Sequence, residues 1–277
     1  MRAPSRVRLD EILVARGLAD SRSAARGLIM AGSVSVSGKV IDKAGTPVAV
    51  DAEVTIKERP RFVSRAGEKL AHALAVLQVD VGGVSALDVG ASTGGFVDCL
   101  LQGGAARVIA LDVGRGQLDS GLRPDPRVVV LDRVNARYLT PDRLPYQPDF
   151  LTMDVSFISV EKIIPAVAAC LAPRFSGLIL VKPQFEAGPE NVGKGGIVRD
   201  PAIHHKVLVK CARFMIEEAG LDVLGMCRSG LKGADGNQEF FIHTGRGGEE
   251  GFGTDRLEAI AEGVIAAGRM PVGGAAT

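Results

Sequence analysis

The 277-residue sequence lacks paired cysteines, a long apolar run and an apolar segment at its N-terminus. No C-x-x-C pair and no histidine at ligand spacing accompany its four cysteines, which are Cys99, Cys170, Cys211 and Cys227. This pattern predicts buried, reduced thiols and no metal site. The longest apolar run, "IIPAVAACLAP", contains Pro165 and is far shorter than the roughly 20 residues of a membrane-spanning helix. We therefore expect a cytoplasmic protein without a secretion signal or a membrane span.

Charge is distributed unevenly along a chain whose formal net charge is only +1. Residues 1–46 hold eight Lys and Arg against four Asp and Glu, which gives this segment a net charge of +4. A small basic module followed by a neutral, larger one indicates a polyanionic partner, although a solvated surface would give the same count.

The first 58 residues have the pattern of a small α+β module. Apolar residues at helical spacing predict one helix over 9–16, and Ser21 is a suitable N-cap for a second helix over 22–31. Gly32 follows where a left-handed residue commonly ends a helix. The apolar spacing then changes to two, which predicts short strands near 34–41 and 52–58. The second helix is expected to turn Ala24, Ala25, Leu28 and Ile29 inward.

This module resembles the S4 domain, an RNA-binding domain first described in a protein of the small ribosomal subunit. The resemblance is carried by the stretch "RLDEILVARGLADSRSAARGLIMAGSVSVSGKVIDKAG". It implies that basic side chains of the second helix and the adjoining loop contact RNA phosphates. The implied contacts are Arg6, Arg8, Arg22, Arg26 and Lys43. Such contacts position an RNA without reading its bases, and they weaken steeply with salt.

Beyond a linker at 59–64, which contains Pro60, strand and helix patterns alternate over 65–246. This alternation predicts an α/β fold with a doubly wound, Rossmann-like parallel sheet. Seven strands are expected, and no helix separates the last two, so the sheet should end in an antiparallel hairpin as in class I methyltransferases. The strands fall at 84–90, 106–114, 127–132, 149–156, 177–183, 222–227 and 238–244. Residues 247–277 are expected to form a C-terminal helix and a disordered tail.

The stretch "DVGASTGGF" after the first of these strands differs from a dinucleotide fingerprint, because Ser92 stands where the second glycine would admit a pyrophosphate. Asp112 ends the next strand, where an acid can bind ribose hydroxyls. A ribose without a pyrophosphate suits S-adenosylmethionine, although this loop alone does not exclude a nicotinamide cofactor. The expected cofactor contacts are Asp88, Gly90, Ala91, Ser92, Thr93, Gly94, Gly95, Phe96, Asp112 and Asn135. Strand ends should also bring Gly90, Asp112, Asp132, Asp154 and Lys182 around one crevice.

Six ordered motifs identify the chain as similar to the TlyA/hemolysin A family of ribosomal RNA 2′-O-methyltransferases, whose catalytic half resembles FtsJ. The motifs are "SRAGEKL", "DVGASTGGF", "DVGRGQL", "MDVSFIS", "LVKPQFE" and "GNQEFF", and the resemblance covers residues 5 to about 244. It implies S-adenosylmethionine-dependent methylation of cytidine ribose, with ribosomal RNA or ribosomal subunits as partners and no membrane. It also implies a catalytic tetrad of Lys69, Asp154, Lys182 and Glu239.

The chemistry of methyl transfer to a ribose hydroxyl gives these four residues a role. The 2′-hydroxyl is a weak nucleophile and needs a base or a close hydrogen-bond acceptor. If Lys69 lies next to Lys182, each cation favours the neutral amine of the other, whereas Asp154 and Glu239 oppose this effect. Which lysine is the base therefore stays open. Two alternatives are a noncatalytic RNA-binding factor and a membrane-lytic protein, but no segment is long and apolar enough for the latter.

Several other stretches receive structural interpretations. "GPENVGKG" resembles a phosphate-binding loop but lacks its Ser or Thr and its preceding strand, so we interpret it as a mobile substrate loop. His204 and His205 are expected on a helix surface, and Phe240 and Phe241 in the core. Phe157 follows Asp154 and could either line a target pocket or pack inside.

Overall fold

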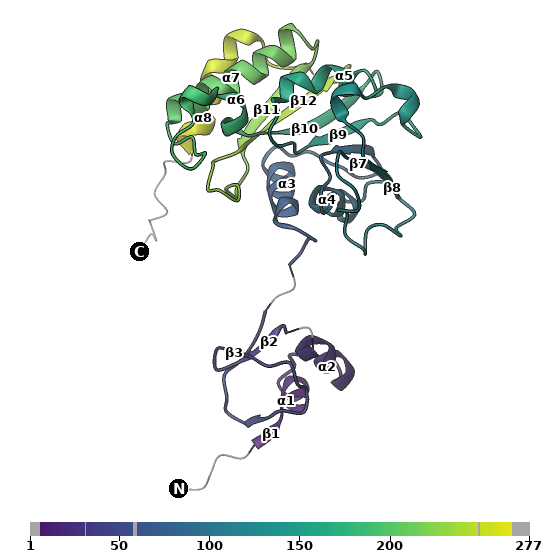
Figure 1. Cartoon of the computed structure of the whole chain (residues 1–277), viewed down its shortest axis with the longest axis vertical. Helices are drawn as coiled ribbons and strands as arrows, with labels where there is room; N and C mark the ends of the chain where they lie inside the picture. Colours follow the sequence, from purple (N-terminus) through teal and green to yellow (C-terminus); the bar gives the residue numbers. More distant parts are fainter. Residues whose placement is uncertain (1–5, 31, 58–59, 249, 268–277) are drawn as a thin grey trace. The chain divides into compact units, whose positions relative to one another are not determined.

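The computed structural model describes residues 6–30, 32–57, 60–248 and 250–267. The chain divides into two compact units, of which the first ends at Pro60 and the second begins at Arg61. In Figure 1 the first unit is purple to blue, and the second continues from blue through teal and green to yellow. This division falls within the stretch that the sequence marks as a linker.

Within its described residues, the first unit has two helices and five short strands around a small apolar core. The helices are α1 (Leu9–Ala15) and α2 (Arg22–Met30), and the strands are β1 (Arg6–Arg8), β2 (Val34–Val36), β3 (Lys39–Val40), β4 (Pro47–Ala49) and β5 (Val54–Ile56). Strands β3, β2 and β5 form one antiparallel sheet, as the spacing of apolar residues predicts. The side chain of Ser21 accepts a hydrogen bond from the Ala24 amide at 3.2 Å, and Gly32 has a φ of 68°, so both expected helix ends are confirmed.

Two features of this unit differ from the prediction. Strands β1 and β4 pair with each other in a second sheet, which the sequence does not reveal because each has only three residues and they carry Arg6, Arg8 and Pro47. Ala24 is exposed, and α2 buries only Ala25 and Ile29 fully. The buried face of α2 is therefore narrower than four residues, and its basic side chains are correspondingly more accessible.

The second unit contains a seven-stranded sheet in the order β11-β12-β10-β9-β6-β7-β8. The strands are β6 (Ser85–Val89), β7 (Arg107–Asp112), β8 (Val128–Asp132), β9 (Phe150–Met153), β10 (Phe175–Val181), β11 (Asp222–Arg228) and β12 (Phe240–Arg246). Strand β12 lies between β10 and β11 and is antiparallel to both, whereas the neighbours from β10 to β8 are parallel. The predicted doubly wound sheet with a terminal antiparallel hairpin is confirmed.

Helices cover both faces of this sheet (Figure 1). One face packs against α3 (Arg65–Val76) and α4 (Gly95–Gln102), and the other against α5 (Ile164–Ala168), α7 (Pro201–Glu217) and α8 (Leu257–Ala267). The short α6 (Pro183–Glu186) follows β10, and single 3-10 turns fall at Ala136–Tyr138, Pro141–Arg143, Val160–Lys162, Pro189–Asn191 and Thr254–Arg256. Phe240 and Phe241 are fully buried in opposite cores, because successive strand residues point to opposite faces.

The observed burial agrees with the prediction for the cysteines but not with the prediction for His204. All four cysteines are buried and unpaired, and burial raises the pKa of Cys99 and of Cys227 to about 12, so these thiols stay protonated. His204 is only 8% exposed, and its Nε2 lies 3.0 Å from the carbonyl oxygen of Val198, so the expected surface position was wrong. The ring of His204 packs edge-on against Phe240.

No helix within the described part of the chain is both long and apolar enough to cross a membrane. The predicted C-terminal helix corresponds to α8. The expected tail, from residue 268 onward, lies outside the described residues.

Candidate functional site

A cavity of about 450 Å³ opens at the carboxyl edge of the parallel strands, where open α/β sheets bind their ligands. Five of the expected site residues line it: Gly90, Ser92, Asp112, Asn135 and Asp154. The remaining wall is largely apolar and includes Val113, Val134, Ile158 and Ile163. An apolar cavity with a few converging polar groups is the usual form of a small-molecule site.

Asp112 joins two loops at the edge of this cavity. One of its carboxylate oxygens accepts the Ser92 amide at 2.8 Å, and the other accepts the Gly114 amide at 2.7 Å. A carboxylate has about four lone-pair positions, so these two bonds leave acceptor capacity that faces the cavity. The carboxylate is therefore both an anchor for the glycine loop and an available acceptor for hydroxyl groups.

The glycine loop passes very close to the end of the neighbouring strand. Gly90 has a φ of +86°, and a Cβ atom at this position would clash with the carbonyl oxygen of Asp154. Only glycine suits both the left-handed backbone and this close approach. The loop thereby brings Gly90 and Ser92 to the same cavity as Asp154.

Asp88 corrects the prediction of a direct cofactor contact. Its side chain is fully buried, one oxygen accepts the hydroxyl of Thr152 at 2.8 Å, and the other has no hydrogen-bond partner among the described residues. Burial raises its pKa to about 7, against the opposing effect of the Thr152 hydrogen bond. Asp88 therefore lies under the loop without reaching the cavity. The sequence could not show whether Asp88 lies under the loop or in the cavity wall, because an acid at the end of a strand can occupy either position.

Other loop residues also support the cavity from behind. Ala91, Gly94, Gly95 and Phe96 are buried and do not line it, and Thr93 is exposed but lies outside its wall. Their contribution is to shape the turn from β6 into α4. The loop is thus a scaffold in which Gly90 and Ser92 are the members that reach the cavity surface.

The expected crevice of five strand-end residues is correct only in part. Asp132 ends β8 but points elsewhere, accepting the Gly116 amide at 3.1 Å and pairing with Arg123 at 3.2 Å. Lys182 does not line the cavity itself, although it contacts Asp154, which does. The row of strand carboxyl ends is longer than the cavity, so not every residue at a strand end lines the cavity.

The four residues of the expected tetrad form two ion pairs. Lys69 Nζ lies 2.5 Å from Oε2 of Glu239, and Lys182 Nζ lies 2.5 Å from Oδ1 of Asp154. All four side chains are at most 18% exposed. Lys182 also donates to the hydroxyl of Ser156 at 2.9 Å. Each lysine therefore meets a carboxylate, whereas the sequence interpretation considered contact between the two ammonium groups.

The register of the sheet places the two ion pairs at the carboxyl ends of the parallel strands. Val181 pairs with Phe240 across the antiparallel strands β10 and β12, so Lys182 and Glu239 occupy adjacent positions just beyond this pair. Asp154 follows β9, the parallel neighbour of β10. Lys69 reaches the same edge from the middle of α3. Residues that are up to 170 positions apart along the chain thus meet beside the cavity.

The segment after Asp154 forms an exposed part of the cavity wall. Phe157 is 91% exposed, has a φ of +64°, and its ring centroid lies 5.0 Å from that of Phe185. Of the two sequence interpretations, packing in the core is wrong, and Phe157 does line the cavity. Val113 and Ile158 also line the cavity and were not predicted, although they adjoin Asp112 and Phe157. Their position directly after or near a strand end was the available signal.

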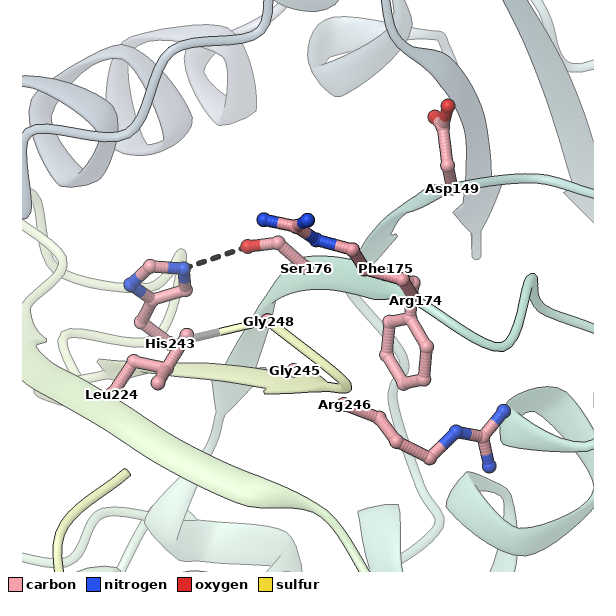
Figure 2. A pocket seen from close by; sticks show the side chains of 9 residues that line it. All are labelled: Asp149, Arg174, Phe175, Ser176, Leu224, His243, Gly245, Arg246 and Gly248. Atoms are coloured by element: carbon pink, nitrogen blue, oxygen red, sulfur yellow. Dashed lines mark hydrogen bonds between the residues drawn. The ribbon is translucent and has the colours of Figure 1, made fainter. Parts of the chain in front are cut away.

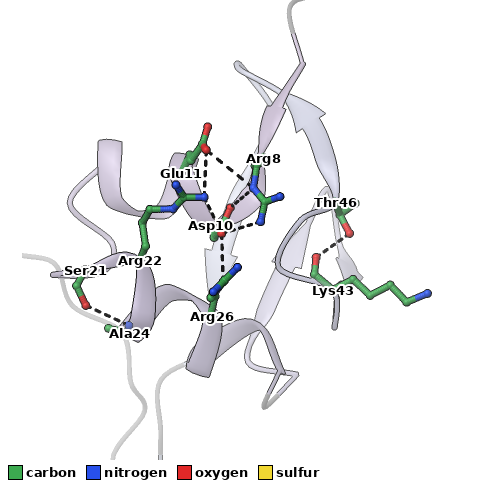
Figure 3. A network of polar contacts seen from close by, with 9 residues as sticks. All are labelled: Arg8, Asp10, Glu11, Ser21, Arg22, Ala24, Arg26, Lys43 and Thr46. Carbon is green, nitrogen blue, oxygen red and sulfur yellow. Dashed lines mark hydrogen bonds and ion pairs between the residues drawn. The ribbon is translucent and has the colours of Figure 1, made fainter.

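Three of the five expected RNA contacts converge on one buried carboxylate in the first unit (Figure 3). Arg8 Nε lies 2.9 Å from Asp10, Arg22 Nη2 lies 3.3 Å from it, and Arg26 Nε lies 3.6 Å from it. Arg6 is exposed on β1, and Lys43 extends away from this cluster (Figure 3). We call Arg8, Asp10, Glu11, Arg22 and Arg26 the arginine cluster.

A second cavity, of about 350 Å³, lies at the amino ends of the parallel strands, whereas the first lies at their carboxyl ends. Figure 2 shows the residues that line it. It adjoins the first residues of β10, Phe175 and Ser176, and Ser176 Oγ is 2.8 Å from Nε2 of His243. Arg246 lies over the ring of Phe175 and donates to backbone carbonyls. None of the expected site residues lines this cavity, which is at the amino ends of the parallel strands.

Glu161, Glu186 and Cys211 form a group of potential metal ligands, with ligand atoms within 4.8 Å of one another. Protein contacts account for both carboxylates, however. Glu186 accepts the Ser159 hydroxyl at 2.7 Å and the Val160 amide at 2.8 Å, and Glu161 pairs with Lys210 at 3.3 Å. These contacts connect α6 and α7 to the segment that follows Phe157.

Two family models match the two units. Residues 7–54 match the S4 domain, and residues 62–246 match the FtsJ-like methyltransferase. Each match covers most of the described part of its unit.

Similar proteins match this chain over most of their own length. The chain is 48% identical to a candidate rRNA methyltransferase, YqxC, from Bacillus subtilis, over 85% of this chain and 84% of that protein. It is 45% identical to the 16S/23S rRNA (cytidine-2′-O)-methyltransferase TlyA from Mycobacterium tuberculosis, over 86% of this chain and 89% of that protein. A solved structure of a candidate hemolysin from Streptococcus thermophilus superposes with a TM-score of 0.70 at 38% identity, covering 95% of this chain and 97% of that one.

Proposed function

The chain belongs to the FtsJ-like methyltransferase family, with an S4 domain before it, and we propose that it methylates the 2′-hydroxyl of cytidine in ribosomal RNA. The observation that carries this proposal is the pair of ion pairs, Lys69 with Glu239 and Lys182 with Asp154, at the edge of the cavity. Two lysines and two acids at this edge suit proton transfer from a hydroxyl group.

The cavity fits S-adenosylmethionine as methyl donor. Asp112 can accept hydrogen bonds from ribose hydroxyls, and the apolar wall with Val113, Val134 and Ile158 suits an adenine ring. Asn135 and Ser92 add polar groups at the rim. When bound, this cofactor supplies a methyl group that is already activated by its positive sulfur, so the proposed transfer requires no metal ion.

The tetrad then has the task of holding and moving one proton. Lys182 Nζ and Lys69 Nζ are the two candidate acceptors for the proton of the ribose hydroxyl. The accepting amine must first release its own proton to the adjacent carboxylate or to solvent. When it takes the hydroxyl proton it becomes an ammonium ion again, and Asp154 or Glu239 pairs with that positive charge. The low exposure of these four side chains limits the access of water to their ion pairs. Phe157, exposed at the same wall, is available to contact the target nucleotide.

The S4 domain supplies affinity for the RNA in this proposal. Arg6, Arg8, Arg22, Arg26 and Lys43 would contact phosphates, so binding should depend strongly on salt and little on sequence. An enzyme with this substrate works where ribosomes and S-adenosylmethionine are, which is the cytoplasm.

Mapping of 2′-O-methyl groups on ribosomal RNA tests the proposal. RNA from a strain that lacks the gene is compared with RNA from its parent and from the same strain carrying either the intact gene or the Lys182→Ala variant. We expect at least one cytidine to lose its methyl group and to regain it only with the intact gene. Identical methylation in all four strains would contradict the proposal and favour a noncatalytic RNA-binding factor.

A further inference from the structure

The arginine cluster is built around an acid that no solvent reaches. The side chain of Asp10 is 0% exposed, whereas those of Arg8, Arg22 and Arg26 are 42%, 55% and 60% exposed. A buried carboxylate is costly unless it is paired, and here three guanidinium groups share it. Figure 3 shows Asp10 between Arg8, Arg22 and Arg26.

The three arginines contact Asp10 in different ways. Arg8 binds both oxygens of Asp10 with Nε and Nη2, at 2.9 and 3.0 Å, which is the two-pronged geometry that fixes a guanidinium plane. Arg22 and Arg26 approach the Oδ2 atom only, at 3.3 and 3.6 Å. Hydrogen bonding by Arg8 holds the pKa of Asp10 at about 2, so the carboxylate stays charged at any physiological pH.

Glu11 provides a contrast within the same cluster. It lies 3.2 Å from Arg22 and 3.9 Å from Arg8, but its side chain is 42% exposed. An exposed carboxylate of this kind reduces the local positive charge and can be displaced by a competing anion, whereas Asp10 cannot leave its place. Three arginines and two acids leave the cluster with a net charge of +1.

We propose that Asp10 is a positioning residue for RNA binding, which holds the three arginines so that their outer N–H groups converge on one backbone phosphate. This inference rests on the proposed function, because it assumes that the first unit binds RNA. Immobilising a free arginine side chain on a ligand costs conformational entropy, and a buried anchor removes part of that cost beforehand. Asp10 acts through the arginines and does not touch the RNA.

The alternative is that both acids simply neutralise the arginines, and the two possibilities predict opposite results. The experiment uses the full chain and ribosomal subunits from a strain that lacks the gene, and it measures the dissociation constant at several salt concentrations. Asp10→Asn removes the anchoring charge, Glu11→Gln removes an equal charge from the exposed position, and Asp20→Asn is a control at an exposed acid outside the cluster.

If Asp10 positions the arginines, Asp10→Asn weakens binding by about tenfold or more although the protein becomes more positive. Glu11→Gln and Asp20→Asn then stay within about threefold of the parent or bind more tightly. If Asp10→Asn binds as well as the parent or better, the inference is overturned. Failure of the parent protein to bind any subunit would instead contradict the proposed function.

Hydrogen exchange of α2 distinguishes lost positioning from lost folding. If α2 keeps its protection in Asp10→Asn, the affinities above decide the question. If it loses protection, Asp10→Glu decides, because this variant keeps the charge but shifts the carboxylate by one methylene group. Weaker binding by Asp10→Glu with α2 protected supports positioning, and unchanged binding overturns it.

Discussion

Lys182 and Asp154 form an ion pair of 2.5 Å at the carboxyl edge of the sheet, and Asp154 belongs at the same time to the wall of the cavity. The pair thus connects the group proposed to move a proton with the site proposed to hold the methyl donor. Its partner pair, Lys69 and Glu239, lies outside the cavity wall. This asymmetry makes Lys182 the first lysine to test.

We expect Lys182→Ala to reduce turnover by about 10²- to 10⁴-fold, as is usual when a positioned base or acceptor is lost. Affinities for cofactor and RNA should survive, because the glycine loop and the first unit are unchanged. Single-turnover methylation at saturating RNA measures this effect, with the exposed Lys162→Ala as control. A near-parental rate would identify Lys182 as a phosphate contact and make Lys69 the next candidate.

Asp112→Ala should weaken binding of S-adenosylmethionine by about 1.5 to 3 kcal/mol, the contribution of a charge-assisted hydrogen bond. The loss also frees the Ser92 amide, which the carboxylate now holds. Calorimetric titration gives the affinity directly. Asp132→Ala is a matched control, since Asp132 is the register partner of Asp112 on β8 but does not line the cavity. Equal effects of both substitutions would contradict the assignment of Asp112.

The buried carboxyl of Asp88 makes the stability of the second unit depend on pH. Its pKa is about 7 in the folded chain, against an ordinary value of 3.8 for an aspartate, so the folded state binds more protons than the unfolded state between these values. The free energy of unfolding therefore falls as the pH rises through this window, by at most about 1.4 kcal/mol for each pH unit. Asp88→Asn keeps an acceptor for Thr152 and removes the charge.

We accordingly expect Asp88→Asn to gain stability relative to the parent as the pH increases from 5 to 8. Urea unfolding at both pH values, followed by circular dichroism, measures the difference. Asp142→Asn, at an exposed acid, should show no such trend. A difference between Asp88→Asn and the parent that is the same at both pH values would mean that Asp88 is charged throughout.

Removal of the first unit should separate RNA capture from cofactor binding. The truncated chain should begin at Arg61, because the Arg61 carbonyl and the Val63 amide hydrogen-bond to Gln102 and Asp98 of α4. We expect it to bind S-adenosylmethionine with parental affinity but not to methylate ribosomal RNA. Full methylation by the truncated chain would show that the S4 domain is dispensable.

Patterns along the sequence were sufficient for the large sheet, whereas the tetrad was implied by the family resemblance and its catalytic role stays a prediction. The alternation of strand and helix patterns predicts β6 to β12. Gly90 and Asp112 could be predicted to line the cavity, because one belongs to a glycine-rich loop after a strand and the other is an acid at the end of a strand. Burial of individual polar groups was not predictable. Asp88 and Asp10 have the same residue type as exposed acids nearby, and only packing shows that one lies under a loop and the other under three arginines.

The pairing of the lysines was also beyond sequence analysis. An edge of a sheet can be predicted from strand ends, but the partner of each side chain depends on the register between β10 and β12 and on the position of α3. Short strands such as β1 and β4 have too few residues for a periodic signal, and their pairing arises from the closure of the small core.

The insertion of β12 between β10 and β11 has a consequence for synthesis of the protein. Glu239 immediately precedes β12, so the glycine loop and both lysines are translated well before the last member of the tetrad. Termination of translation before β12 would release a chain with the cofactor segment but without the strand between β10 and β11. Nonsense mutations upstream of residue 239 should therefore be null for methylation.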